Sequence, residues 1–207
     1  MSLDVALARI TQLQSMFAPG AAPATTAAPA PSTSTAFATA LQNAGGTATL
    51  TGAAGTQAAA PTAAGQAVLN AVRGEVGVAE EPKGSNDSPR ISQYRQATAG
   101  SGVGPWCAYF VSWAARQAGV PLGDSGQGFG RVDDVYAWGQ RTGKAIPAGS
   151  APPQPGDLIV WDEHIGVVEN VLPDGRIQTI EGNSSDQVAR RTYDSGGGGA
   201  VGFVRLG

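Results

Sequence analysis

Two residues of the chain, Cys107 and His164, could carry nucleophilic chemistry, and each is the only one of its type among the 207 residues. A deprotonated cysteine attacks carbonyl carbons, and a nearby histidine can take the thiol proton and later give a proton to the leaving group. Any Cys/His pair in this chain must therefore be this pair. The same count excludes an internal disulfide and a metal site built from several cysteines.

The segment around Cys107, "VGPWCAYFVSWAARQAGVP", predicts a helix that begins close to the thiol. A Gly-Pro turn precedes it, the apolar residues follow a helical period, Gly119 suits a C-terminal cap and Pro121 blocks continuation. A helix N-terminus favours a thiolate and offers free backbone N–H groups to an oxyanion. Two interpretations stay open: Cys107 is a nucleophile at a helix start, or it is a small core residue beside Trp106 and Tyr109.

The residues after His164 predict a β-hairpin that brings polar side chains to the histidine. With a two-residue turn at Asp174-Gly175, Gly166 lies opposite Asn183 and leaves space beside the histidine. In that register His164, Glu181 and Asn183 share one face of the sheet, whereas a one-residue slip would separate them. The alternative is that His164 is an exposed residue at a strand start.

The charge of the chain argues against nucleic acid and acidic membrane surfaces as partners. It has 13 Lys and Arg residues against 16 Asp and Glu residues, a net charge of −3. Phosphate binding needs a basic patch or stripe, and the sequence has none.

The N-terminal third is distinct in composition, because residues 10–72 contain no charged residue. Residues 1–18 predict an amphipathic helix, with Ala6, Ile10, Leu13 and Phe17 on one stripe. It is too short and polar to span a membrane and lacks the basic start and unbroken apolar stretch of a signal peptide. Residues 19–64, rich in Ala, Thr and Pro, predict a disordered linker in which "STAFATALQNA" is a candidate docking peptide or transient helix.

Residues 65–207 predict one domain of the α+β class, with helices first and an antiparallel sheet second. The helical signals are the stripe of Leu69, Val72 and Val76, the segment "NDSPRISQYRQA" with Ser88 as N-cap, the cysteine helix, and "RVDDVYAWGQRTG". The predicted strands are "DLIVW", "HIGVVENV", "RIQTIEGN", "QVARRTY" and "VGFVRL".

Taken in order, "PWCAYFVSWAARQAG", "PQPGDLIVW", "HIGVVENV", "IEGNSS", "RRTY" and "GFVRL" resemble the CHAP family, the cysteine, histidine-dependent amidohydrolases/peptidases of bacteria and their phages. The related NlpC/P60 family also uses a cysteine and a histidine, but the "EGN" element favours CHAP. The resemblance implies a papain-like α+β fold with helices packed on an antiparallel sheet. It also implies Cys107 as nucleophile, His164 as base, Glu181 as the residue that orients the imidazole, and Asn183 as a further polar site residue.

The resemblance further implies cleavage of amide bonds in peptidoglycan, either between muramic acid and the stem peptide or within the peptides. Two other functions stay open: a non-catalytic wall-binding or appendage-assembly scaffold, and a thiol hydrolase acting on a non-wall amide. Trp106 and Trp161 are candidate substrate-binding walls of the groove, unless at least one of them is a core aromatic. The Gly-rich "GDSGQGFGRVDD" lacks the ending of a phosphate loop and predicts a rim loop of the cleft.

We expect no metal or other cofactor, because the segment "QATAGSGVG" ahead of Cys107 has no carboxylate of the kind that binds calcium in some phage members. The expected partner is peptidoglycan, with the N-terminal helix as a candidate docking element for a protein, such as a component of a cell-envelope appendage. A monomer is expected. The expected location is the cell envelope or the exterior, reached without a recognisable cleavable signal.

Overall fold

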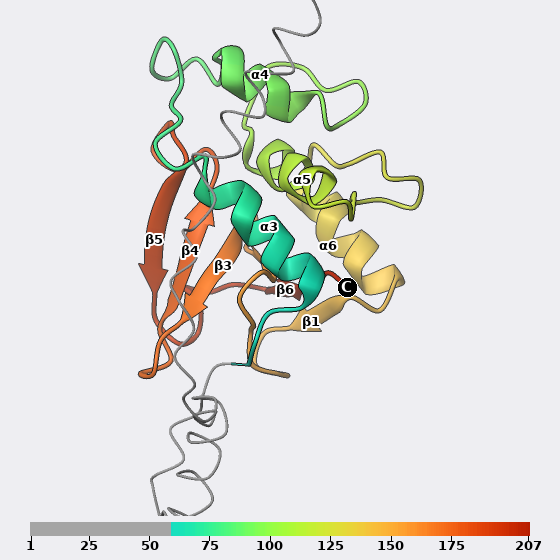
Figure 1. Cartoon of the computed structure of the whole chain (residues 1–207), viewed down its shortest axis with the longest axis vertical. Helices are drawn as coiled ribbons and strands as arrows, with labels where there is room; N and C mark the ends of the chain where they lie inside the picture. Colours follow the sequence, from blue (N-terminus) through green and yellow to red (C-terminus); the bar gives the residue numbers. More distant parts are fainter. Residues whose placement is uncertain (1–58) are drawn as a thin grey trace, which may run out of the picture. The chain divides into compact units, whose positions relative to one another are not determined.

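Four helices and a six-stranded antiparallel sheet make up residues 59–207, the part of the chain that the computed structural model describes (Figure 1). The helices are α3 (Ala63–Arg73), α4 (Pro89–Arg95), α5 (Cys107–Gln117) and α6 (Val132–Arg141). The strands are β1 (Ala145–Pro147), β2 (Leu158–Val160), β3 (Ile165–Val171), β4 (Ile177–Glu181), β5 (Ala189–Tyr193) and β6 (Gly202–Val204), in the spatial order β1-β6-β2-β3-β4-β5. The predicted α+β arrangement, with helices first and an antiparallel sheet second, is confirmed. The predictions for residues 1–18 and for "STAFATALQNA" lie outside the described residues.

The helix ends follow the predicted local signals. The Ser88 side chain caps α4 by accepting a hydrogen bond from the backbone N–H of Ile91, and Pro89 occupies the first turn. Helix α5 ends at Gln117, and the predicted cap glycine, Gly119, follows two residues later with a φ of 74°. There the Val120 N–H donates to the Ala115 carbonyl, so the last turn closes without a side-chain partner.

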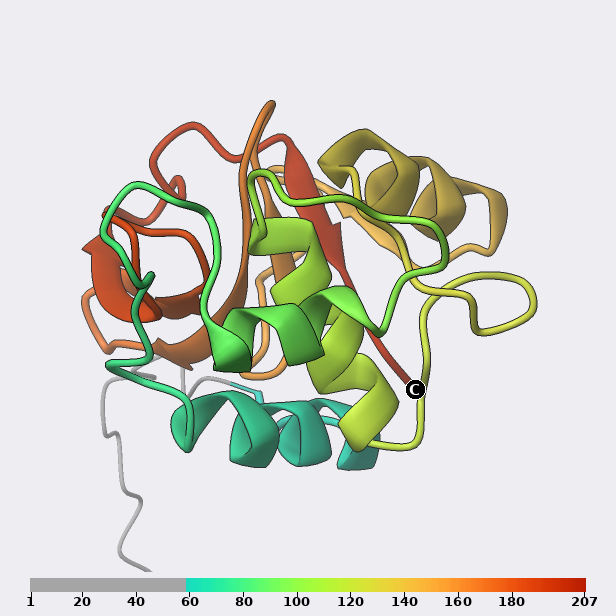
Figure 2. The same ribbon diagram turned by 90° about the horizontal axis from the view of Figure 1, so that it is seen from above.

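Helix α5 is the central helix of the domain. It contacts α3, α4, α6 and β3 (Figure 2). Its residues Phe110, Val111 and Ala114 are fully buried and pack in one apolar cluster with inward-facing residues of the sheet, such as Val167 and Ile180. The helix that begins at Cys107 is thus held by the core on several sides, which fixes the position of the thiol.

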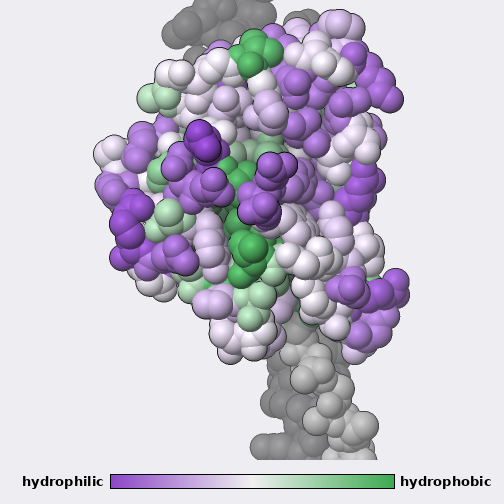
Figure 3. All heavy atoms as spheres, turned by 180° about the vertical axis from the view of Figure 1, so that it is seen from behind, coloured by the Kyte–Doolittle hydropathy of each residue, from purple (hydrophilic) through white to green (hydrophobic). Residues whose placement is uncertain are grey.

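The other face of the sheet has a smaller apolar cluster. Because side chains alternate along a strand, Ile159, Val168, Ile177 and Phe203 point away from the helices and pack together with Ala200. Among the described residues the only exposed large apolar side chains are Val76, Val103 and Val201. On the face seen in Figure 3, apolar residues form a narrow band bordered by hydrophilic ones. Most apolar side chains therefore lie in the two clusters.

The hairpin between β3 and β4 differs from the prediction at its turn. The turn has three residues, Pro173–Gly175, because the Leu172 N–H donates to the Arg176 carbonyl over 2.8 Å. Gly175, with a φ of 85°, supplies the left-handed residue that such a turn needs. This changes the register by one residue.

A β-bulge between Val168 and Asn170 changes the register by one more residue. Beyond it, Val167 pairs with Ile180, so Glu181 and not Asn183 comes opposite Gly166. Each one-residue shift alone would have moved Glu181 to the other face. Because there are two shifts, the predicted register is wrong but the predicted face is right.

Strand β1 was not predicted from the sequence. Its residues Ala145–Pro147 pair with β6, which also pairs with β2. The strand has only three residues and ends in proline, so the segment has too few alternating residues to signal a strand.

The domain starts earlier than the predicted boundary between residues 64 and 65. Helix α3 begins at Ala63, and its N-cap Thr62 accepts a hydrogen bond from the Gly65 N–H. The Thr62 hydroxyl also donates to the Leu206 carbonyl over 2.6 Å, which joins the start of the domain to the residues that follow β6. The boundary at 65 therefore cuts through the first helix.

We expect a chain starting at residue 59 to be more stable than one starting at residue 65. Loss of the Thr62 cap and of its bond to Leu206 should lower the free energy of unfolding by about 1–3 kcal/mol. Urea unfolding followed by circular dichroism measures the difference. Equal midpoints for the two chains would show that residues 59–64 contribute nothing to the fold.

Candidate active site

Cys107 is the first residue of α5, and the helix start is anchored by its neighbour Trp106. Trp106 is fully buried and its indole Nε1–H donates to the Glu80 carboxylate over 2.9 Å. No side chain caps the N-terminus of α5, so the first backbone N–H groups are free of a capping partner. Cys107 itself is 5% exposed and lines a pocket. The thiol is therefore held rigidly while still bordering open space.

His164 lies immediately before β3, next to two of the other predicted site residues, Cys107 and Glu181. Its Nε2 lies 2.9 Å from Oε2 of Glu181, and the ring lies close enough to Cys107 for that side chain to raise the pKa of the imidazole. Because Nε2 faces Glu181, Nδ1 is the ring nitrogen left for the thiol. The imidazole thus joins the start of α5 to the end of β4.

Two glycines make this approach possible. A Cβ on Gly166 would lie 2.6 Å from Cγ of Glu181, so only glycine leaves room for the carboxylate on the neighbouring strand. A Cβ on Gly182 would lie 2.6 Å from Cβ of Phe110, so Gly182 lets α5 pack closely against the end of β4. The role of Gly182 was missed from the sequence, although its place in "EGN" was noted.

The charges of the three groups are coupled. Burial disfavours the charged imidazolium, but hydrogen bonds to Cys107 and Glu181, together with their charges, outweigh burial and raise the pKa of His164 to about 9. Burial also opposes ionisation of Glu181, yet hydrogen bonds from His164 and Thr179 hold the pKa of Glu181 below its ordinary value. At neutral pH the arrangement therefore favours an imidazolium beside a carboxylate.

The pocket at Cys107 has a volume of about 390 Å³ and an acidic rim. Its lining includes Asp133, Asp162 and Glu163, with Arg131 as the basic residue. Gly130 and Arg131 come from the Gly-rich segment that was predicted to form a rim of the cleft. The thiol is therefore accessible to a ligand from the side of α6 and of the loop before His164.

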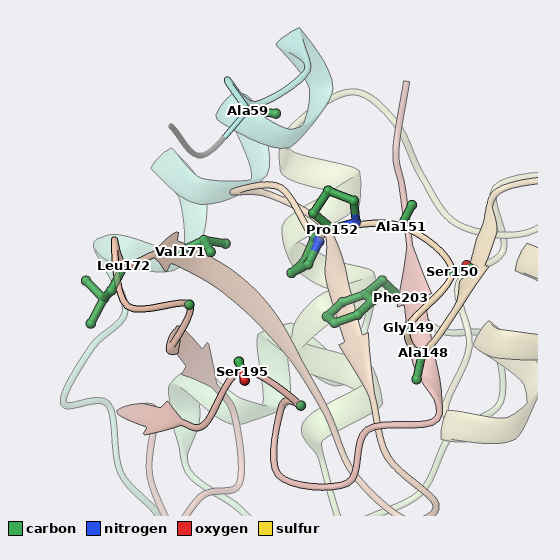
Figure 4. A pocket seen from close by; sticks show the side chains of 13 residues that line it. Ala59, Ala148, Gly149, Ser150, Ala151, Pro152, Val171, Leu172, Ser195 and Phe203 are labelled. Atoms are coloured by element: carbon green, nitrogen blue, oxygen red, sulfur yellow. The ribbon is translucent and has the colours of Figure 1, made fainter. Parts of the chain in front are cut away.

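A larger pocket of about 620 Å³ lies elsewhere, between segment 148–153, Phe203 and the turns near Leu172 and Ser195 (Figure 4). Its lining has no cysteine, histidine or carboxylate. Size alone would select this pocket, but the groups that can carry nucleophilic chemistry line the smaller one.

Residues 98–183 match the family model of the CHAP domain. This segment of the chain is similar to CHAP domains. The match contains Cys107, His164, Glu181 and Asn183, and so includes every residue predicted for catalysis. A search among curated proteins gave no match.

One solved structure similar to this chain is that of the peptidoglycan hydrolase RipB from Mycobacterium tuberculosis, with 20% sequence identity and a TM-score of 0.42. The alignment covers 69% of this chain and 64% of RipB. The chain thus spans less than two thirds of the length of RipB.

The fold does not join Asn183 to His164 and Glu181 by a hydrogen bond. Asn183 is half-buried and has a φ of 56°, in the left-handed region that asparagine tolerates better than most residues. Within the described residues no hydrogen bond joins its side chain to His164, whose Nε2 is taken by Glu181. Asn183 remains a candidate site residue without a hydrogen bond to the imidazole.

The two predicted substrate-binding tryptophans differ in position. Trp106 is fully buried, so the prediction that it lines the groove is wrong, and its role is to anchor the start of α5. Trp161 is half-buried, and its ring centroid lies 5.6 Å from that of His164. Trp161 also lines a second pocket next to Asp162, so it remains a candidate wall of the cleft.

Within residues 59–207, no group of three or more His, Cys, Asp and Glu side chains is arranged to hold a metal ion. The absence of a metal remains a prediction.

Proposed function

We propose that this chain is a peptidoglycan hydrolase that cleaves amide bonds with Cys107 as nucleophile, His164 as proton carrier and Glu181 as the residue that orients and charges the imidazole. The observation that carries the proposal is the position of His164, which is hydrogen-bonded to Glu181 and lies close enough to Cys107 for that side chain to raise the pKa of the imidazole. The CHAP match supports peptidoglycan as the substrate class.

In the first half of the reaction, the Cys107 sulfur, its proton held by His164, attacks the amide carbonyl carbon. The carbonyl oxygen becomes an oxyanion, which the uncapped N–H groups at the start of α5 are suited to stabilise. The C–N bond then breaks as His164 gives its proton to the departing amine. The product of this half is a thioester on Cys107 and a free amine.

In the second half, His164 is neutral and takes a proton from water as the water oxygen attacks the thioester carbonyl. The C–S bond breaks, the acyl group leaves as a carboxylic acid, and Cys107 with His164 returns to the starting state. Throughout, the buried Glu181 carboxylate stabilises the imidazolium whenever it forms.

Because the proposed substrate is peptidoglycan, we propose that the enzyme acts in the cell envelope or outside the cell. Among the described residues, no helix combines the length and apolar character that crossing a membrane requires. The N-terminal helix predicted at residues 1–18 and the linker at 19–64 are the proposed elements of delivery, through docking to an envelope or appendage protein. We propose that the chain acts as a monomer, because all catalytic groups come from one chain.

Digestion of purified peptidoglycan should release fragments whose masses identify a cleaved amide bond. A new N-terminal alanine with peptide-free glycan identifies cleavage at muramic acid, and a new amine within the stem peptide or cross-bridge identifies an endopeptidase. Mass spectrometry of the soluble fragments distinguishes the two, with Cys107→Ala as the control. New reducing sugar ends without new amines would contradict the proposal, because a thiol amidase leaves the glycosidic bonds intact.

A further inference from the structure

The Glu181 carboxylate is almost fully buried, with 1% exposure, and it has other polar neighbours in addition to His164. Its Oε2 faces His164, while its Oε1 accepts a hydrogen bond of 2.5 Å from the hydroxyl of Thr179, which is also fully buried. Thr179 and Glu181 are two residues apart on β4 and so point to the same side. Burial, together with the charge of Glu181 and a hydrogen bond to it, raises the pKa of Tyr193 to about 12. The Thr179 hydroxyl thus donates to a buried carboxylate, and the Tyr193 hydroxyl lies close enough for its pKa to respond to the same carboxylate.

Tyr193 also reaches His164 through Trp161. The Trp161 ring lies between the two, with its centroid 5.0 Å from that of Tyr193 and 5.6 Å from that of His164. His164 is therefore supported twice from β5: through a polar contact by way of Glu181 and through an aromatic contact by way of Trp161. A change in the position of Tyr193 would disturb both.

The loop of residues 194–199, which contains the four consecutive glycines and is called the glycine loop below, holds these aromatic rings. The Trp161 Nε1–H donates to the Gly197 carbonyl over 2.8 Å. Asp194 Oδ1 accepts hydrogen bonds from the N–H groups of Gly196 and Gly198, so the loop is folded on its own side chain. Gly198 has a φ of 64°, and a Cβ there would lie 2.6 Å from Cδ1 of Tyr193. The run of glycines thus allows the loop to pack closely on the Tyr193 ring and to accept the hydrogen bond from Trp161.

We propose that Thr179, Tyr193 and Trp161 are positioning residues for the His164–Glu181 pair, and that the glycine loop fixes the two aromatic residues among them. The inference rests on the proposed function, because it assigns these residues to the same reaction. None of them touches the reacting atoms in this scheme. They act by keeping the carboxylate charged, in line with the imidazole and shielded from water.

The first test removes the two hydroxyls. Thr179→Val and Tyr193→Phe should each lower kcat on peptidoglycan about tenfold, because each removes a hydroxyl that supports the charged carboxylate, and should leave KM within about twofold. Thr179→Ser keeps a hydroxyl and should retain most of the activity. Thr192→Val, an exposed position on β5, is the matched control and should behave as wild type.

The second readout needs no substrate. Because His164 is the only histidine, its imidazole NMR signals can be followed against pH without assignment, and protonation of Glu181 appears in them as an inflection on the acid side. Loss of hydroxyl donors raises the pKa of a buried carboxylate. In the double variant Thr179→Val/Tyr193→Phe this inflection should therefore move to higher pH.

Two alanine variants with similar backbone strain test the role of the glycine loop. Gly198 and Gly199 both have positive φ, of 64° and 83°, but a Cβ on Gly199 meets nothing within 4 Å. Gly198→Ala should lower kcat severalfold more than Gly199→Ala, because only the former displaces the Tyr193 ring. Equal effects of the two variants would remove the glycine loop from the proposal.

Wild-type kcat and an unmoved acid-side inflection in the double variant would overturn the proposal, and so would a loss of kcat without movement of the inflection, because that result is expected of a purely structural defect. If the wild type fails to hydrolyse peptidoglycan, the proposed function fails. The titration of His164 still tests the positioning in that case, so the two failures are distinguishable.

Discussion

Replacement of Cys107 by alanine is expected to abolish hydrolysis of peptidoglycan, with a fall in kcat of at least about 10⁴-fold, as expected when the nucleophile of a catalytic unit is removed. Without the sulfur no thioester can form, and His164 has no thiol proton to carry. Cys107 is buried at the start of α5, but alanine removes only one atom from the core. The free energy of unfolding should fall by about 1 kcal/mol or less. Release of soluble fragments and urea unfolding measure the two effects.

Alkylation provides the control for this prediction. Cys107 is the only cysteine, so iodoacetamide can modify thiol sulfur at this residue alone. The alkylated wild type should be as inactive as Cys107→Ala while remaining folded. An alanine variant that digests peptidoglycan at the wild-type rate would remove the thiol mechanism, and one that unfolds would favour the interpretation of Cys107 as a core residue.

Replacement of Glu181 by glutamine should lower kcat by about 10³-fold or more, because the residue that orients and charges the base is lost. With a neutral amide in place of the carboxylate, the pKa of His164 should fall from about 9 towards its ordinary value of 6.5. The alkaline side of the pH–rate profile should therefore move to lower pH. The profile of kcat between pH 5 and pH 10, measured on the fragments released, tests both expectations.

The same substitution should change the free energy of unfolding by an amount that depends on pH. A histidine whose pKa is raised in the folded state stabilises the fold fully below its unfolded value of 6.5, and this contribution is lost as the pH rises through about 9. The pH-dependent part of the stability difference between wild type and Glu181→Gln should accordingly be largest between about pH 4.5 and pH 6.5, disappear above pH 9, and decrease in acid as Glu181 becomes protonated.

Asn183→Ala is the matched comparison, because Asn183 lies two residues further on without a hydrogen bond to His164. Its effect on kcat should be at least tenfold smaller than that of Glu181→Gln, since an amide without contact to the imidazole neither orients nor charges it. A fully active Glu181→Gln together with an inactive Asn183→Ala would assign the orienting role to Asn183.

Local signals in the sequence predicted the elements that hold the site. The cap at Ser88, the glycine after α5 and the period of the apolar residues depend on neighbouring residues alone, and each gave the correct helix. Cys107 and His164 could be paired because each occurs once. The likeness of the ordered motifs to the CHAP family then agreed with the family match over residues 98–183.

What the sequence could not give depends on contacts between distant segments. The bulge at Glu169 is not apparent from its neighbours; in the structure this carboxylate is bonded to Arg73 of α3 and Arg190 of β5. The burial of Trp106 depends on Glu80, a residue of a loop far away in the chain. The role of the glycine loop depends on Trp161, which is more than thirty residues earlier. Periodicity and capping carry no information on such pairs.

The titration of His164 by NMR tests the central claim most directly, since it reports on the contact of one imidazole with both Cys107 and Glu181. In the wild type the midpoint should lie near pH 9, and Cys107→Ala and Glu181→Gln should each move it towards 6.5. A wild-type midpoint at 6.5 that neither variant moves would show that the three residues do not act as one unit, and would contradict the proposed mechanism.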